Sequence, residues 1–141
     1  MLFYSTTSVT GWTLVVLLVV TVLYPFLLRA GVLGPVQPFL VRMRFHYWLG
    51  YTITAIVLVH TWISMSTRLA GSVNETGLYL ATGALILVCI QVGIGRRLSW
   101  PKLSQRHLLR RWHLGLMIGI AVLVLSHILL DSAMLHMLLF R

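Results

Sequence analysis

Long apolar runs alternate with short polar segments along the whole chain, and this pattern predicts four helices that cross a membrane. A helix of roughly 20 apolar residues spans the hydrocarbon core of a bilayer, which is about 30 Å thick. Runs of that length fall at residues 9–28, 45–66, 77–94 and 108–130. We therefore expect an all-α membrane protein with a single domain, residues 1–141, folded as a four-transmembrane-helix bundle.

The segments outside these runs predict loops and an interfacial tail. Two glycines and two prolines between residues 31 and 38 interrupt any helix there. The segment 96–107 is polar and basic, and predicts a second loop. The tail 132–141 is apolar but too short to span, so we expect it to prolong the fourth helix or to lie along the interface. The first run is too long for a signal peptide and has no basic residue before it, so we interpret it as a mature helix.

The composition excludes an ordinary soluble domain, because 59% of the residues are hydrophobic and only 9% are charged. A net charge of +9 can indicate a protein that binds nucleic acid. Here the basic residues lie between apolar runs, so we interpret them as topology signals beside membrane lipid and expect no nucleic-acid partner.

The distribution of the 11 basic residues predicts the orientation of the chain. Nine of them lie in or beside the first and third loops, against two elsewhere: Arg29, Arg42, Arg44, Arg96, Arg97, Lys102, Arg106, Arg110 and Arg111, against Arg68 and Arg141. The positive-inside rule then puts both loops in the cytoplasm and both termini on the outer side, as for a protein of a bacterial cytoplasmic membrane. The second and fourth helices consequently run parallel.

Four of the six histidines form two equally spaced pairs. His46 and His60 on the second span are 14 residues apart, as are His113 and His127 on the fourth. Fourteen residues come within about 40° of a whole number of helical turns, so each pair shares one face and is separated by about 21 Å of helix. Because the two helices run parallel, we expect His46 level with His113 and His60 level with His127.

A six-coordinate, b-type haem iron takes two facing imidazoles as its axial ligands, and an unpaired imidazole is costly inside a membrane. The spacing therefore predicts two stacked, non-covalently bound b haems and electron transfer across the membrane. Cys89, the one cysteine, allows no covalent haem attachment through C-x-x-C-H and no thiolate metal cluster. Zinc is excluded because it takes three or four protein ligands, and each level has two histidines.

A different interpretation stays open for each histidine. A lone imidazole in a membrane is commonly a hydrogen-bond partner between helices. The alternative function is therefore an accessory or structural subunit of a respiratory or photosynthetic membrane complex, whose histidines pack or bind pigment.

Small and basic residues near the pairs are further candidates for haem contact. Gly50 lies one turn after His46 and leaves room for a flat macrocycle, although glycines also let membrane helices pack closely. Arg44, Arg110 and Arg111 lie beside the inner pair and are suited to bind anionic haem propionates. For Asp131 we favour helix capping over orienting a ligand or taking a proton, and for His107 and His136 we favour headgroup contacts, with a quinone contact of His136 left open.

The histidines and their neighbours resemble the ferric reductase-like transmembrane domain, the haem module of ferric reductases and NADPH oxidases. The matching segments are residues 42–50 (RMRFHYWLG), 59–61 (VHT), 110–113 (RRWH) and 126–127 (SH). The resemblance implies that His46 and His113 ligate an inner haem iron, and that His60 and His127 ligate an outer one.

The resemblance also implies partners. Complete reductases of this family usually have six spans and a cytoplasmic domain that binds FAD and NADPH, whereas this sequence contains four spans and no glycine-rich dinucleotide loop. We therefore expect a subunit of a larger redox complex, with electrons supplied on the cytoplasmic side by quinol or a separate flavoprotein, on which any reductase activity would depend. Cytochrome b subunits of respiratory complexes have similarly spaced histidines, so the kinship itself stays open.

Overall fold

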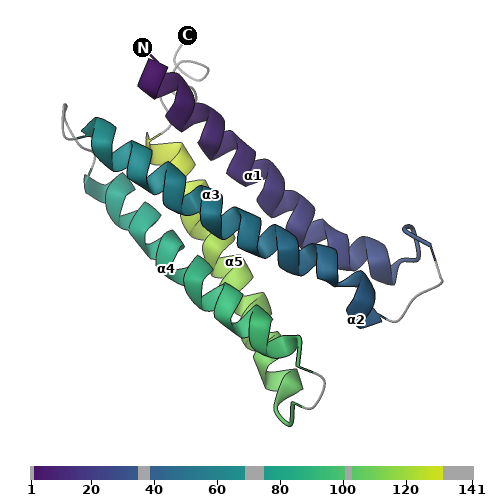
Figure 1. Cartoon of the computed structure of the whole chain (residues 1–141). Coiled ribbons are helices and arrows are strands. Elements are labelled where there is room, and N and C mark those ends of the chain that lie inside the picture. The colour runs from purple at the N-terminus through teal and green to yellow at the C-terminus, as the bar shows by residue number, and fades with distance from the viewer. Residues whose placement is uncertain (1, 35–38, 69–74, 101–102, 132–141) are drawn as a thin grey trace. The chain divides into compact units, whose positions relative to one another are not determined.

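The computed structural model describes residues 2–34, 39–68, 75–100 and 103–131, and all regular secondary structure in these segments is helical (Figure 1). There are four long helices and one short one: α1 (Leu2–Arg29), α2 (Phe39–Arg42), α3 (Arg44–Arg68), α4 (Glu75–Leu98) and α5 (Arg106–Asp131). The four long helices contain apolar segments of 23 to 25 residues, enough to cross a membrane. The all-α class with four membrane-length helices is thus confirmed.

The helices extend further than the apolar runs alone predict. α4 begins at Glu75 and continues to Leu98, and α5 already begins at Arg106. The expected basic loop 96–107 is therefore shorter, because long basic side chains reach water from a helix end without interrupting its backbone hydrogen bonds. Part of the first predicted loop, residues 35–38, and the predicted tail 132–141 lie outside the described residues.

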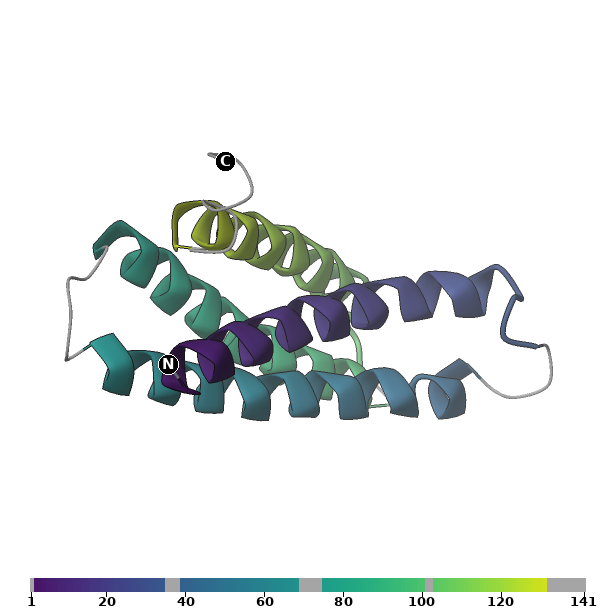
Figure 2. The ribbon, with the colours of Figure 1, turned by 90° about the horizontal axis from the view of Figure 1, so that it is seen from above.

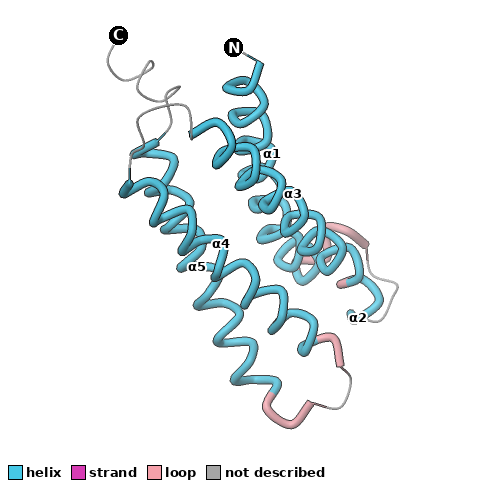
Figure 3. Tube along the Cα trace, turned by 60° about the vertical axis from the view of Figure 1, so that its left-hand side comes forward, coloured by secondary structure: helices cyan, strands magenta, loops and turns pink. Residues whose placement is uncertain are grey.

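The chain divides into two compact units, Met1–Gly71 and Ser72–Arg141. The first contains α1, α2 and α3, with α1 and α3 side by side and antiparallel, as Figures 1 and 2 show. The second contains α4 and α5, which also pack as an antiparallel pair (Figure 3). We refer to these units as the first and the second hairpin.

α1 ends in a glycine cap that turns the chain back towards α3. Gly31 has a φ of +75°, its N–H donates to Leu28 O at 3.3 Å, and the N–H of Val32 donates to Leu27 O at 3.2 Å. These two bonds form a Schellman motif, in which glycine takes the left-handed position at low cost. The last carbonyls of α1 are thereby satisfied before the chain enters the connection drawn in pink in Figure 3.

Side chains near this turn hold the end of α1 to the start of α3. The Tyr24 hydroxyl donates to Arg42 O at 2.8 Å, and the Tyr24 ring lies 5.0 Å from that of Phe45, centroid to centroid. The Arg42 guanidinium in turn donates to Gly34 O. The basic end of the first hairpin is therefore closed by polar contacts as well as by aromatic packing.

The second hairpin packs through glycines that accept leucines from the opposite helix. A Cβ built on Gly119 of α5 would lie 3.3 Å from Leu87 Cδ1, and one built on Gly83 of α4 would lie 3.4 Å from Leu123 Cδ1. Ala84 and Val88 of α4 are buried along the same helix. Small residues let membrane helices approach closely, since dispersion contacts rather than water exclusion drive their association.

We expect Gly119→Val to weaken the second hairpin, because its side chain would displace Leu87; overpacking of this kind costs about 1–3 kcal/mol. The measurement is the free energy of unfolding in detergent micelles during a dodecyl sulfate titration. Gly115→Val is the matched control, since a Cβ there meets no heavy atom of the described residues within 4 Å. Equal destabilisation of the two variants would contradict this packing.

Candidate histidine site

His46 is anchored to the backbone of α1. Its Nδ1 lies 3.1 Å from Thr21 O. A carbonyl oxygen only accepts hydrogen bonds, so Nδ1 must be the atom that carries the proton and donates it. The neutral ring is then the tautomer whose lone pair lies on Nε2.

His60, on the same helix as His46, is anchored to a side chain of α1. Its Nδ1 lies 2.9 Å from Thr10 Oγ1, and that hydroxyl also lies 2.9 Å from Thr6 O and 3.0 Å from Thr7 O. A hydroxyl both donates and accepts, so Thr10 Oγ1 links His60 to α1 in either tautomer of the ring. A Cβ built on Gly11 would lie 3.3 Å from His60 Cε1, so the absence of a side chain at Gly11 leaves room for the ring against α1.

His127 in the second hairpin repeats the carbonyl contact. Its Nδ1 lies 3.1 Å from Gly77 O of α4, which makes Nδ1 the donor and places the lone pair on Nε2. Gly77 is buried in the first turn of α4. The His127 imidazole thus contacts the backbone of the neighbouring helix near its start.

His113 repeats the glycine contact. A Cβ built on Gly95 of α4 would lie 3.4 Å from His113 Cε1. The amide of Gln91, one turn earlier on α4, donates from Nε2 to His113 O at 3.0 Å. Gln91 Oε1 is buried and has no hydrogen-bond partner among the described residues. This buried polar group was not singled out by the sequence analysis.

Each hairpin therefore contains the same arrangement. The second helix carries two histidines 14 residues apart, and both rings pack on the first helix, one against a backbone carbonyl and one against a glycine. All four imidazoles are partly buried. The structure places both members of each pair against the same neighbouring helix, while the pairing of His46 with His113, and of His60 with His127, stays a prediction.

The other predicted contacts lie near the histidines on exposed or open positions. A Cβ built on Gly50 would meet no heavy atom of the described residues within 4 Å, which is compatible with the predicted clearance. Arg44, Arg110 and Arg111 are exposed, as is His107, the second residue of α5. His136 and the side chain of Asp131 lie outside the described residues.

The described histidines occur in pairs along one helix and not in a three-ligand cluster. Within the described segments, no three His, Cys, Asp or Glu side chains lie close enough together to hold a metal ion. A structural or catalytic zinc takes at least three such ligands, whereas a b-type haem iron takes two imidazoles and four porphyrin nitrogens. Nδ1 donation to the protein also leaves Nε2 as the ring's basic atom, which is the usual arrangement of a metal-bound histidine.

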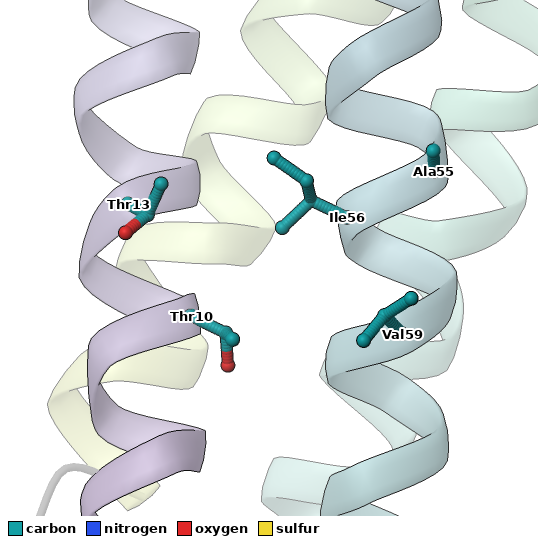
Figure 4. A pocket seen from close by; sticks show the side chains of 5 residues that line it. All are labelled: Thr10, Thr13, Ala55, Ile56 and Val59. Atoms are coloured by element: carbon teal, nitrogen blue, oxygen red, sulfur yellow. The ribbon is translucent and has the colours of Figure 1, made fainter.

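An open groove of about 340 Å³ lies between the helices of the first hairpin (Figure 4). Thr10 and Thr13 of α1 line one wall, and three apolar side chains of α3 line the other: Ala55, Ile56 and Val59. With two hydroxyls its only polar side chains, the groove offers no ligand for a metal. It does leave the Thr10 contact of His60 bordered by open space.

No protein-family model, curated protein or solved structure matches this chain.

We expect Thr10→Val to destabilise the first hairpin, because it removes the hydrogen-bond partner of His60 Nδ1 without changing the side-chain shape. Hydrogen bonds between membrane helices average about 0.6 kcal/mol in double-mutant cycles. The measurement is the coupling energy of Thr10→Val with His60→Leu, from unfolding titrations of the four proteins in micelles.

Thr13→Val is the matched control, because the Thr13 hydroxyl donates to Val9 O within its own helix. Its coupling with His60→Leu should be close to zero. A coupling as large as that of Thr10 would argue against a specific Thr10–His60 bond.

Proposed function

We propose that this chain is a di-haem, b-type cytochrome that transfers electrons across a membrane as a subunit of a larger redox complex. His46 and His113 would ligate one haem iron, and His60 and His127 the other. The observation that carries the proposal is the anchoring of the imidazoles: His46 and His127 donate Nδ1–H to a backbone carbonyl of the neighbouring helix, and His60 Nδ1 hydrogen-bonds the Thr10 hydroxyl. His46 and His127 therefore have Nε2 as their basic nitrogen.

The protein's part in this function is to hold imidazoles at chosen depths and orientations. Two anchored rings lie on each of α3 and α5, separated by 14 residues or about 21 Å of helix. Anchoring restricts rotation about the side-chain bonds, so less conformational entropy is lost when Nε2 binds a metal. When bound, each haem iron supplies reversible one-electron transfer between its ferric and ferrous states.

Nearby residues suit the charge and shape of such a group. Gly50 leaves open space one turn after His46. Arg44, Arg110 and Arg111 are exposed near the ends of α3 and α5, where guanidinium groups would pair with anionic propionates or with lipid phosphates. Large apolar side chains such as Trp48 and Trp62 remain more than two-thirds exposed, which suits contact with lipid.

The charge distribution extends the proposal to topology and partners. With the basic loops in the cytoplasm, both termini face outward and the His46–His113 pair is the inner one. Electrons would enter there from quinol or a flavoprotein, as the resemblance to the ferric reductase-like transmembrane domain implies. The membrane would be the cytoplasmic membrane of a bacterium, and reductase activity would need the separate electron donor.

The second candidate is the accessory or structural subunit introduced above. The same hydrogen bonds favour it, because histidines that bond Thr10 and the carbonyls of Thr21 and Gly77 also hold helices together without any cofactor. The two functions differ in one measurable property, the haem content of the purified protein.

We expect the purified chain to hold about two b haems, measured by the pyridine haemochrome assay and by a reduced-minus-oxidised spectrum. Double variants test the pairing. His46→Ala with His113→Ala removes both ligands of one iron, so about one haem should remain. His46→Ala with His127→Ala removes one ligand from each iron, so both haems should be lost.

His107→Ala is the matched control for these variants, since His107 is exposed at the start of α5 and belongs to neither pair. It should keep both haems. Haem content that is unchanged in all four single histidine variants would leave the accessory subunit as the better interpretation.

The proposed topology is tested by labelling single cysteines in bacterial spheroplasts with a membrane-impermeant maleimide. In a Cys89→Ser background, Glu75→Cys lies at the start of α4 and should be labelled from outside. Ser99→Cys follows the other end of α4 and should be labelled only after permeabilisation. The reverse pattern would contradict the orientation.

A further inference from the structure

Pro25 interrupts the hydrogen-bond ladder of α1 at the carbonyl that His46 contacts. We propose that Pro25 is a positioning residue for His46: it makes Thr21 O available as the acceptor of His46 Nδ1–H, and thereby selects the tautomer in which Nε2 is the basic atom. This tautomer is a property of the apoprotein. Only its consequence for an iron bound at Nε2 rests on the proposed function.

The position of the proline within α1 is the first observation. Pro25 lies inside the helix Leu2–Arg29, and Thr21 is four residues before it. In an α-helix the carbonyl of residue 21 accepts from the N–H of residue 25, but proline has no N–H. The ladder is therefore missing its donor at Thr21 O.

A carbonyl without a donor is costly inside a membrane, because no water can replace the missing bond and each unsatisfied group costs several kcal/mol. His46 Nδ1–H, 3.1 Å away, supplies the donor from the neighbouring helix. The hydroxyl of Thr21 does not take this role, since it donates to Leu17 O at 2.7 Å. The proline and the histidine thus complement each other across the first hairpin.

His127 provides an internal comparison. It donates to Gly77 O at the same distance of 3.1 Å, but Ala81, four residues on from Gly77 in α4, retains its N–H. The Gly77 carbonyl is accordingly shared between the helix ladder and the imidazole. We expect the proton of His46 to be held on Nδ1 more firmly than that of His127, although the two bonds have equal lengths.

The consequence for an iron site follows from the tautomer. When Nδ1–H donates a hydrogen bond, Nε2 becomes a stronger electron donor. The hydrogen-bond acceptors of metal-bound histidines generally have this effect. If the proposed function holds, Pro25 therefore stabilises the ferric state at the His46 level and lowers the midpoint potential of one haem relative to the other.

The test restores the missing N–H. We would label the histidines of the full-length apoprotein with ¹⁵N, assign the His46 signals by their loss in His46→Gln, and record ¹⁵N shifts in alkaline buffer, where the imidazoles are neutral. The wild type should show His46 protonated on Nδ1. In Pro25→Ala the N–H of residue 25 competes for Thr21 O, so the ratio of the Nδ1–H to the Nε2–H tautomer should fall by about threefold or more.

Pro25→Gly separates the effect of the N–H from that of the proline ring, because it also restores the donor but adds no methyl group; the same shift of tautomer is expected. Leu23→Ala, an exposed position of α1, controls for general perturbation and should leave the ratio unchanged. The His127 signals should not move in any of these variants.

An unchanged His46 tautomer in both proline variants would overturn the proposal, as would a wild-type His46 protonated on Nε2. These outcomes are independent of haem content, so they are distinguishable from a failure of the proposed function. In haem-loaded protein, Pro25→Ala should raise one midpoint potential while leaving the other in place.

Discussion

Every polar group that enters the hydrocarbon of a membrane must find its partner within the protein, and this constraint explains the contacts of the histidines. An imidazole has one N–H in its neutral form, and hydrocarbon offers it no acceptor. His46 and His127 use backbone carbonyls of the neighbouring helix, and His60 uses a threonine hydroxyl. The helices on which these acceptors lie, α1 and α4, carry no histidine themselves. They act as supports for the helices that do.

Each hairpin has one histidine against a backbone carbonyl and one against a glycine, but the order of the two along the helix is reversed. In the first hairpin the carbonyl contact belongs to His46 and the glycine contact to His60; in the second the later histidine, His127, has the carbonyl and His113 has the glycine. At Gly11 and Gly95 a side chain would crowd an imidazole ring, whereas at Gly119 it would crowd a leucine. What matters at each is the absence of a side chain and not conformational freedom.

The sequence predicts the helices well because the length of an apolar run relates directly to the thickness of a bilayer. It also predicts which histidines share a face, since spacing along one helix is a local property. It does not predict which helix that face packs against, because all four helices are apolar on most sides and can pack in several ways. Thr10, Gly77 and Gln91 were therefore missed as partners of His60, His127 and His113. Two signals in the sequence were available: Gln91 lies inside an apolar run, and Pro25 lies four residues after Thr21.

The division of the polar contacts between the hairpins has a consequence for biogenesis. The Nδ1 atoms of His46, His60 and His127 are hydrogen-bonded inside the hairpin to which each histidine belongs. These three imidazoles therefore need no partner from the other hairpin for their Nδ1 atoms. If the proposed haems bind, membrane insertion and haem binding would be separable steps, because these contacts need no haem.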